Sequence, residues 1–141
     1  MRRDDVDDWN RRVIDEFRAN GGVVGGQFAD VPLLLLHTTG ARSGAERVHP
    51  VTYRRLDTGQ LAIFASKAGA PTHPDWYHNL LADPHAAIEL GTESFPVVAV
   101  VADPGQRDAI WEQQKADVPV FAEYESRTDR KIPVVILERA G

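Results

Sequence analysis

The chain has 141 residues, of which 43% are hydrophobic, and this length suits one compact domain with a core of its own. Its formal net charge of −5 argues against general nucleic-acid binding, and the lack of cysteine excludes disulfides, thiol catalysis and thiolate metal sites. No apolar run is long enough for a membrane-spanning helix or a secretory signal, so we expect a cytoplasmic protein.

The first predicted element is an amphipathic helix over residues 5–19, ended by the Asn-Gly-Gly that follows. Four apolar residues share one face of it: Val6, Trp9, Val13 and Phe17. Its mixed charges do not suit an anionic lipid surface, so we expect the apolar face to pack on the core. Peripheral contact with a membrane stays open as an alternative. A glycine pair at 25–26 then predicts a flexible connection.

Six strands and two further helices are predicted along the rest of the chain. The strands are expected at 31–39, 47–55, 61–66, 86–90, 94–101 and 132–137, and the helices at 75–82 and 104–117. Asp103 is the expected N-cap of the last helix, with Pro104 in its first position. Tight hairpins at Thr58-Gly59 and Gly91-Thr92 imply antiparallel pairing, which favours a small barrel over a dinucleotide-binding sheet.

The stretch HTTGARSGAERVHP lies in a basic part of this acidic chain, since residues 40–67 hold five cations and two acids. Gly40 and Gly44 would let the backbone approach a ligand closely. Arg42 and Arg47 could fork onto phosphate or carboxylate oxygens. The alternative is an ordinary β-turn whose arginines are solvated.

A second stretch, SKAGAPTHPDWYHNL, could face the same ligand. Ser66 and Lys67 end the third predicted strand, and Trp76 and Tyr77 could form a flat wall for a ring system. Asn79 offers a two-sided amide. The alternative for Trp76 is the core face of a short helix.

Phe121 and Tyr124, spaced i and i+3, could cap a pocket or simply pack at a helix end. The histidines lack metal-site spacing, because His73 and His78 do not share a helical face and no HExxH occurs, so no metal site is expected. No GxSxG motif for a serine hydrolase occurs either. The residues alone therefore predict a small barrel with a site for a flat, anionic ligand.

Three motifs in this order, TTGARSG-x-x-R-x-x-P, ASKAGAPTHPDWYHNL-x-A-x-P and Y-x-x-x-T-D-R-x-I-P-V, resemble the deazaflavin-dependent nitroreductases of actinobacteria. The resemblance runs from about residue 21 to residue 137. It implies an α+β fold, a flavin-reductase-like split β-barrel of six antiparallel strands with flanking helices. Residues 1–141 would form one deazaflavin-binding domain, with an N-terminal amphipathic helix within residues 1–20. The implied cofactor is coenzyme F420, an 8-hydroxy-5-deazaflavin whose polyanionic tail the basic turn would hold.

The resemblance also implies site residues. Tail contacts would fall on Ala41, Arg42, Ser43, Arg47, Val48, His49, Pro50, Val51 and Thr52. The ring would lie along Phe64, Ala65, Ser66 and Lys67, closed by Asp75, Trp76, Tyr77, His78 and Asn79, with Phe121 and Tyr124 on the substrate side. Ser66, Lys67 or Tyr124 could donate to developing negative charge. Ala41 and Phe121 depart from members that carry a basic residue and a tyrosine there.

The implied activity is hydride transfer from reduced coenzyme F420 to a small-molecule electron acceptor, namely a quinone, a nitroaromatic or a similar conjugated compound. One alternative is an FMN-binding reductase on the same barrel, which the multi-cation turn makes less favoured. Another is a deazaflavin carrier without efficient turnover. Strand edges could pair two copies into a homodimer.

Overall fold

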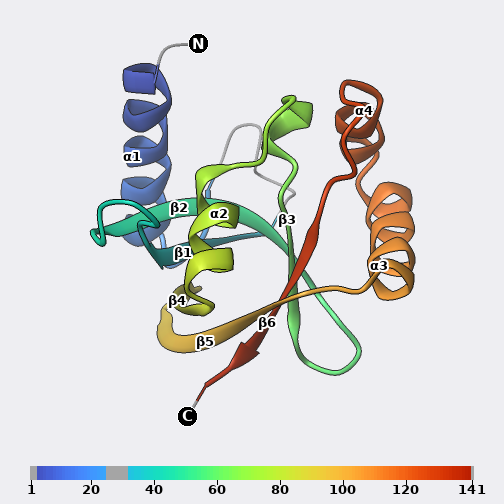
Figure 1. Cartoon of the computed structure of the whole chain (residues 1–141). Helices are drawn as coiled ribbons and strands as arrows, with labels where there is room; N and C mark the ends of the chain where they lie inside the picture. The colour runs from blue at the N-terminus through green and yellow to red at the C-terminus, as the bar shows by residue number, and fades with distance from the viewer. Residues whose placement is uncertain (1–2, 25–31, 141) are drawn as a thin grey trace.

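Six antiparallel strands close into a barrel in the order β1-β2-β3-β6-β5-β4 in this computed structural model, which describes residues 3–24 and 32–140 (Figure 1). The strands are β1 Leu33–Thr39, β2 Glu46–Arg55, β3 Leu61–Phe64, β4 His85–Leu90, β5 Glu93–Val101 and β6 Val134–Arg139. The helices are α1 Arg3–Ala19, α2 Asp75–Ala82, α3 Pro104–Asp117 and α4 Val120–Ser126. The predicted antiparallel barrel is therefore confirmed, whereas the glycine connection at 25–26 lies outside the described residues.

The leucine run of β1 is buried on both of its faces, which explains why it is apolar without alternation. Leu34 and Leu36 point into the barrel core. Leu33 and Leu35 point outward and pack against α1, chiefly against Phe17, which is 1% exposed. Trp9, Val13 and Phe17 of the predicted apolar face thus pack against the barrel wall. Arg18 of α1 adds an ion pair to Glu89 of β4 at 2.7 Å.

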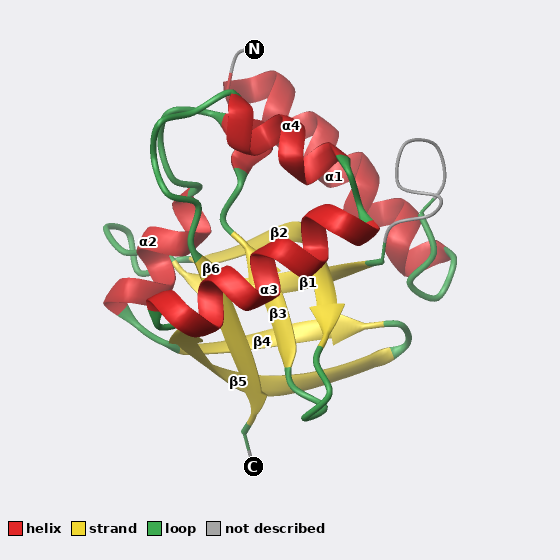
Figure 2. Cartoon of the chain, turned by 90° about the vertical axis from the view of Figure 1, so that its right-hand side faces the viewer, coloured by secondary structure: helices red, strands yellow, loops and turns green. Residues whose placement is uncertain are grey.

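A second apolar layer lies between the barrel wall and the pair α3 and α4. Figure 2 shows α3 lying across the wall, with α4 above it. Phe64 of β3 and Ile136 of β6 point outward into this layer, where they meet Trp111 of α3 and Phe121 of α4. The inward residues of the same strands belong to the barrel core. The sheet therefore separates two apolar cores.

The two ends of the barrel differ. Helix α2 covers one end, where Trp76 and Leu80 enter the barrel core. The β1–β2 turn, the end of β3 and the start of β6 lie at this end, which we call the α2 end. The β2–β3 and β4–β5 hairpins and the end of β6 lie at the other, the hairpin end.

Most predicted elements are confirmed, with α2 and α3 at their expected bounds and the Asp103 side chain accepting from the Gln106 amide at 2.8 Å. Four strand ends were wrong by two residues, two of them being the start of β1, at Leu33 rather than at residue 31, and the end of β6, at Arg139 rather than at residue 137. β3 stops at Phe64 rather than at residue 66, because the chain turns into a 3-10 turn, Lys67–Gly69. β6 begins at Val134 rather than at residue 132, just after a proline that has no amide to donate. Helix α4 was not predicted.

Candidate cofactor site

The β1–β2 turn is a tightly bonded loop whose glycines are needed by the turn itself. The Gly40 amide donates to Ala45 O at 2.8 Å, and the Gly44 amide donates to Gly40 O at 2.9 Å. Gly44 has a φ of 70°, and a Cβ at Gly40 would lie 2.7 Å from Ser43 Oγ. Ser43 Oγ accepts from the Ala45 amide at 3.1 Å, so this predicted tail contact already supports the turn.

Asn79 of α2 braces this turn. Its Oδ1 accepts from the Ala41 amide at 2.9 Å, and its Nδ2 donates to Thr38 Oγ1 at 3.0 Å. Asn79 is 6% exposed and Thr38 is 3% exposed, so the bond between these two side chains is buried, whereas the bond from the exposed Ala41 is half-buried. The predicted two-sided amide bond exists, but it joins protein to protein. Asn79 therefore shapes the site by holding the turn against α2.

Arg42 and Arg47 are exposed, and among the described side chains neither has a hydrogen-bond or ion-pair partner. Two unpaired guanidinium groups beside a rigid turn fit a polyanionic tail, because such groups can fork onto phosphate and carboxylate oxygens. The other residues predicted for the tail lie within β2, paired with β1: Val48, His49, Pro50, Val51 and Thr52. Val51 is buried in the barrel core and Val48 packs against the α1 layer, so these two side chains serve packing.

The loop after β3 carries Ser66 and Lys67, and its backbone is unusual. Lys67 and Ala68 have φ values of 46° and 53°, a left-handed conformation that side chains with a Cβ rarely adopt. The Lys67 ammonium donates to Thr72 Oγ1 at 3.2 Å. Ala65 is fully buried in the barrel core, whereas Ser66 is half-buried and Lys67 is exposed.

Arg130 holds this loop in place, a role that the sequence analysis did not predict although the residue lies in the third motif. Its guanidinium donates to Ala65 O at 3.0 Å, to Ser66 O at 2.8 Å and to Ala70 O at 2.9 Å. The sequence signal was only the Thr-Asp-Arg tripeptide, which does not tell where an arginine side chain reaches.

On α2, the structure separates the predicted ring-closing residues. Trp76 is 5% exposed and belongs to the barrel core, so the core-face alternative describes it. Tyr77 is half-buried, with its ring 4.9 Å from that of His73. Asp75 and His78 are exposed. Tyr77 and its neighbours are thus the part of α2 that a ligand could reach.

Phe64 and Phe121 pack edge to face, with ring centroids 5.3 Å apart, and are 5% and 3% exposed. Tyr124 is half-buried, with its ring 5.3 Å from that of Phe121. Gly69 joins this group to the loop after β3, because a Cβ there would lie 2.6 Å from Tyr124 O. Of the two residues predicted for the substrate side, only Tyr124 therefore keeps an accessible surface.

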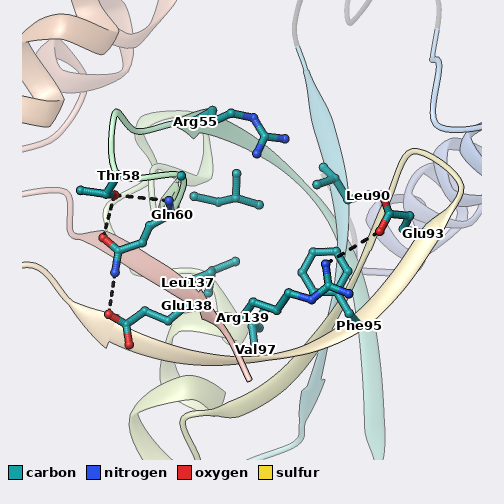
Figure 3. A pocket seen from close by; sticks show the side chains of 12 residues that line it. Arg55, Thr58, Gln60, Leu90, Glu93, Phe95, Val97, Leu137, Glu138 and Arg139 are labelled. Atoms are coloured by element: carbon teal, nitrogen blue, oxygen red, sulfur yellow. Dashed lines mark hydrogen bonds and ion pairs between the residues drawn. The ribbon is translucent and has the colours of Figure 1, made fainter. Parts of the chain in front are cut away.

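In the described part of the chain, no cluster of three or more His, Asp or Glu side chains could hold a metal ion, and no helix is long and apolar enough to cross a membrane. A cavity of about 550 Å³ opens at the hairpin end, lined by Arg55, Phe95, Arg139 and neighbouring residues (Figure 3). It lies at the opposite end of the barrel from the β1–β2 turn and helix α2.

The closed antiparallel barrel with helices on its outer wall defines a reductase-like split-barrel protein. The sequence profile of F420H(2)-dependent quinone reductases matches residues 9–139. The F420H(2)-dependent quinone reductase Rv1261c of Mycobacterium tuberculosis is 39% identical over 127 residues, which cover 87% of this chain and 85% of the relative. The chain belongs to the F420H(2)-dependent quinone reductase family.

Solved structures agree. An F420-H2-dependent reductase, FDR-A, superposes with a TM-score of 0.67 at 39% identity, covering 76% of this chain and 94% of that one. A structure described as a domain-swapped dimer superposes with a TM-score of 0.68 at 37% identity, covering 96% of this chain and 98% of that one. The predicted split barrel, the deazaflavin cofactor and the reductase class are thereby confirmed, whereas the individual site residues stay predictions.

Proposed function

We propose that this chain transfers a hydride from reduced coenzyme F420 to a quinone or a related conjugated acceptor bound at the α2 end. The observation that supports this most is a pair of exposed arginines, Arg42 and Arg47, which have no partner among the described side chains and lie beside a turn that Asn79 holds rigid. Because the turn is already ordered, it loses little conformational entropy when an anion binds. A neutral ligand would gain nothing from these two charges.

Reduced coenzyme F420, when bound, supplies the hydride from C5 of its deazaflavin ring. The chain's own residues bind and orient. Arg42 and Arg47 pair with the anionic tail, and the loop of Ser66 and Lys67 borders the ring. A quinone gains negative charge on oxygen when it accepts a hydride, and the Lys67 ammonium and the Tyr124 hydroxyl are donors for that charge. The proton that completes the reduction comes from solvent.

Titration calorimetry on Arg47→Ala tests the tail site, with Arg55→Ala as the matched control. Both arginines are exposed on β2 and without a partner among the described side chains, but they lie at opposite ends of the barrel. We expect Arg47→Ala to lose about 1.5–3 kcal/mol of coenzyme F420 binding, about 10- to 150-fold in Kd, and Arg55→Ala to bind like the wild type. Equal affinity of all three proteins would remove Arg47 from the site.

Two further measurements separate the alternatives. Tighter binding of FMN than of coenzyme F420 would mean a flavin enzyme on the same barrel. Tight deazaflavin binding without reduction of the quinone menadione would mean a carrier. We also propose a homodimer, supported by the domain-swapped relative, and light scattering coupled to size exclusion would refute it by returning a monomer.

A further inference from the structure

Arg130 is hydrogen-bonded to the backbone of the loop after β3 at several points. Three of its N–H groups reach carbonyls at residues 65, 66 and 70. Arg127 adds a longer contact of 3.5 Å to Ala68 O. The loop between these carbonyls contains the two left-handed residues Lys67 and Ala68, a backbone conformation that is unfavourable for residues with a Cβ. The guanidinium therefore stabilises a backbone conformation that the loop would not adopt alone.

The same guanidinium also fixes the protonation of His73. Arg130 Nη1 lies 2.9 Å from His73 Nδ1. An arginine has only N–H donors, so Nδ1 must be the acceptor, and the neutral ring must carry its proton on Nε2. Burial, the charge of Arg130 and the charge of His78 lower the pKa of His73, which agrees with a neutral ring. The charged and titratable groups around the ring are Arg130, His78, Tyr77 and the Lys67 ammonium on the neighbouring Thr72.

The proton of His73 is thus held on Nε2, which makes this atom a hydrogen-bond donor, and within the described residues nothing accepts from it. The ring is half-buried and lies between the loop after β3 and Tyr77. These are the two segments that border the proposed ring site, so an oxygen of a bound acceptor at the α2 end would find this donor beside Lys67.

We propose that His73 donates its Nε2–H to the acceptor oxygen that gains charge during hydride transfer, and that Arg130 is the positioning residue that holds both His73 and the loop of Ser66 and Lys67. The inference rests on the proposed function. In the step, the acceptor takes the hydride with its electron pair, its oxygen becomes anionic, and the histidine hydrogen bond stabilises that oxygen until a solvent proton arrives. The histidine stays neutral throughout.

Ring nitrogen NMR of His73 in the wild-type protein tests the geometry without turnover. We expect the neutral Nε2–H form at pH 7, with a pKa below the ordinary histidine value because the ring is partly buried and lies beside Arg130. In Arg130→Gln the pKa of His73 should rise, because a neighbouring positive charge is gone. A ring that is protonated at pH 7, or that carries its proton on Nδ1, would overturn the proposal. If Arg130→Gln does not fold, the wild-type spectrum still decides.

Steady-state reduction of menadione tests the chemistry. His73→Phe keeps an aromatic ring but has no donor, so kcat should fall about 10- to 100-fold while the Kd for coenzyme F420 changes less than about twofold. His73→Asn should recover most of kcat, because its amide can accept from Arg130 and donate to the ligand. His85→Phe on β4 is the control and should match the wild type.

The outcomes separate the two proposals. A wild type that does not bind coenzyme F420 refutes the proposed function. A wild type that turns over normally, with His73→Phe equal to it in kcat, refutes the role of His73 alone. A loss in His73→Phe that His73→Asn does not recover points to packing and also refutes the donor.

Discussion

Replacing Asn79 with alanine should loosen the turn that presents Arg42. The change removes two hydrogen bonds, a half-buried one from the Ala41 amide and a buried one to Thr38 Oγ1. Each bond contributes about 0.5–1.5 kcal/mol net, and the Thr38 hydroxyl, only 3% exposed, is then left without its partner. We expect the free energy of unfolding to fall by about 2–4 kcal/mol.

Urea unfolding followed by tryptophan fluorescence measures this loss, and a double-mutant cycle with Thr38→Val identifies its source. The valine removes the orphaned hydroxyl, so the double variant should cost about 1 kcal/mol less than the sum of the single variants. The Kd for coenzyme F420 should rise as well, because the turn must then be ordered on binding. A loss of under about 0.5 kcal/mol in unfolding free energy, or strict additivity of the two substitutions, would refute the role of Asn79 in holding the turn.

Three further changes test the fold around the site. Gly69→Ala should cost about 2–4 kcal/mol of unfolding free energy, because its Cβ would lie 2.6 Å from Tyr124 O at a φ of 80°. Gly59→Ala, with open space around it, should cost about 1 kcal/mol by the same urea assay. Equal losses in the two variants would contradict this. The hydrogen bond from Arg18 holds the pKa of Glu89 below its ordinary value. Its contribution to stability is therefore present above about pH 4.5 and is lost as pH falls through the lower, folded-state pKa. Glu89→Gln should flatten the acid limb of the plot of unfolding free energy against pH, and an unchanged limb would contradict this. Phe17→Ala, at a 1% exposed position, should cost about 3–5 kcal/mol, and a smaller loss than 1 kcal/mol would show that α1 contributes little to the barrel wall.

The barrel could be predicted because its signals are local. Tight turns and apolar runs fixed the strands, and Asp103 and Pro104 fixed the start of α3. Helix α4 was missed because it is only seven residues long, and its i, i+3 pair of Phe121 and Tyr124 fits a cap on a pocket as well as packing at a helix end. The closing pair β3 and β6 joins residues about 70 apart, and no sequence pattern gives that register.

The site could be predicted only in part, for a similar reason. Arg42 and Arg47 stand out in an acidic chain, so the sequence predicts them as an anion site, and the structure shows both residues exposed. The role of Asn79 was assigned to a ligand, because the sequence does not show that Ala41 and Thr38 already occupy both ends of its amide. Arg130 reaches carbonyls some 60 residues away, and such contacts appear only once the chain is folded.

The two apolar cores on either side of the sheet suggest where this scaffold tolerates variation. Volume added or removed beneath α4, around Phe121, meets Phe64 and Trp111 but not the interior of the barrel. The turn that carries the arginines rests on α2 and the barrel instead. Directed evolution for a bulkier acceptor should therefore randomise the α3–α4 layer, where a library can change the packing beneath Tyr124 without repacking the turn beside the arginines.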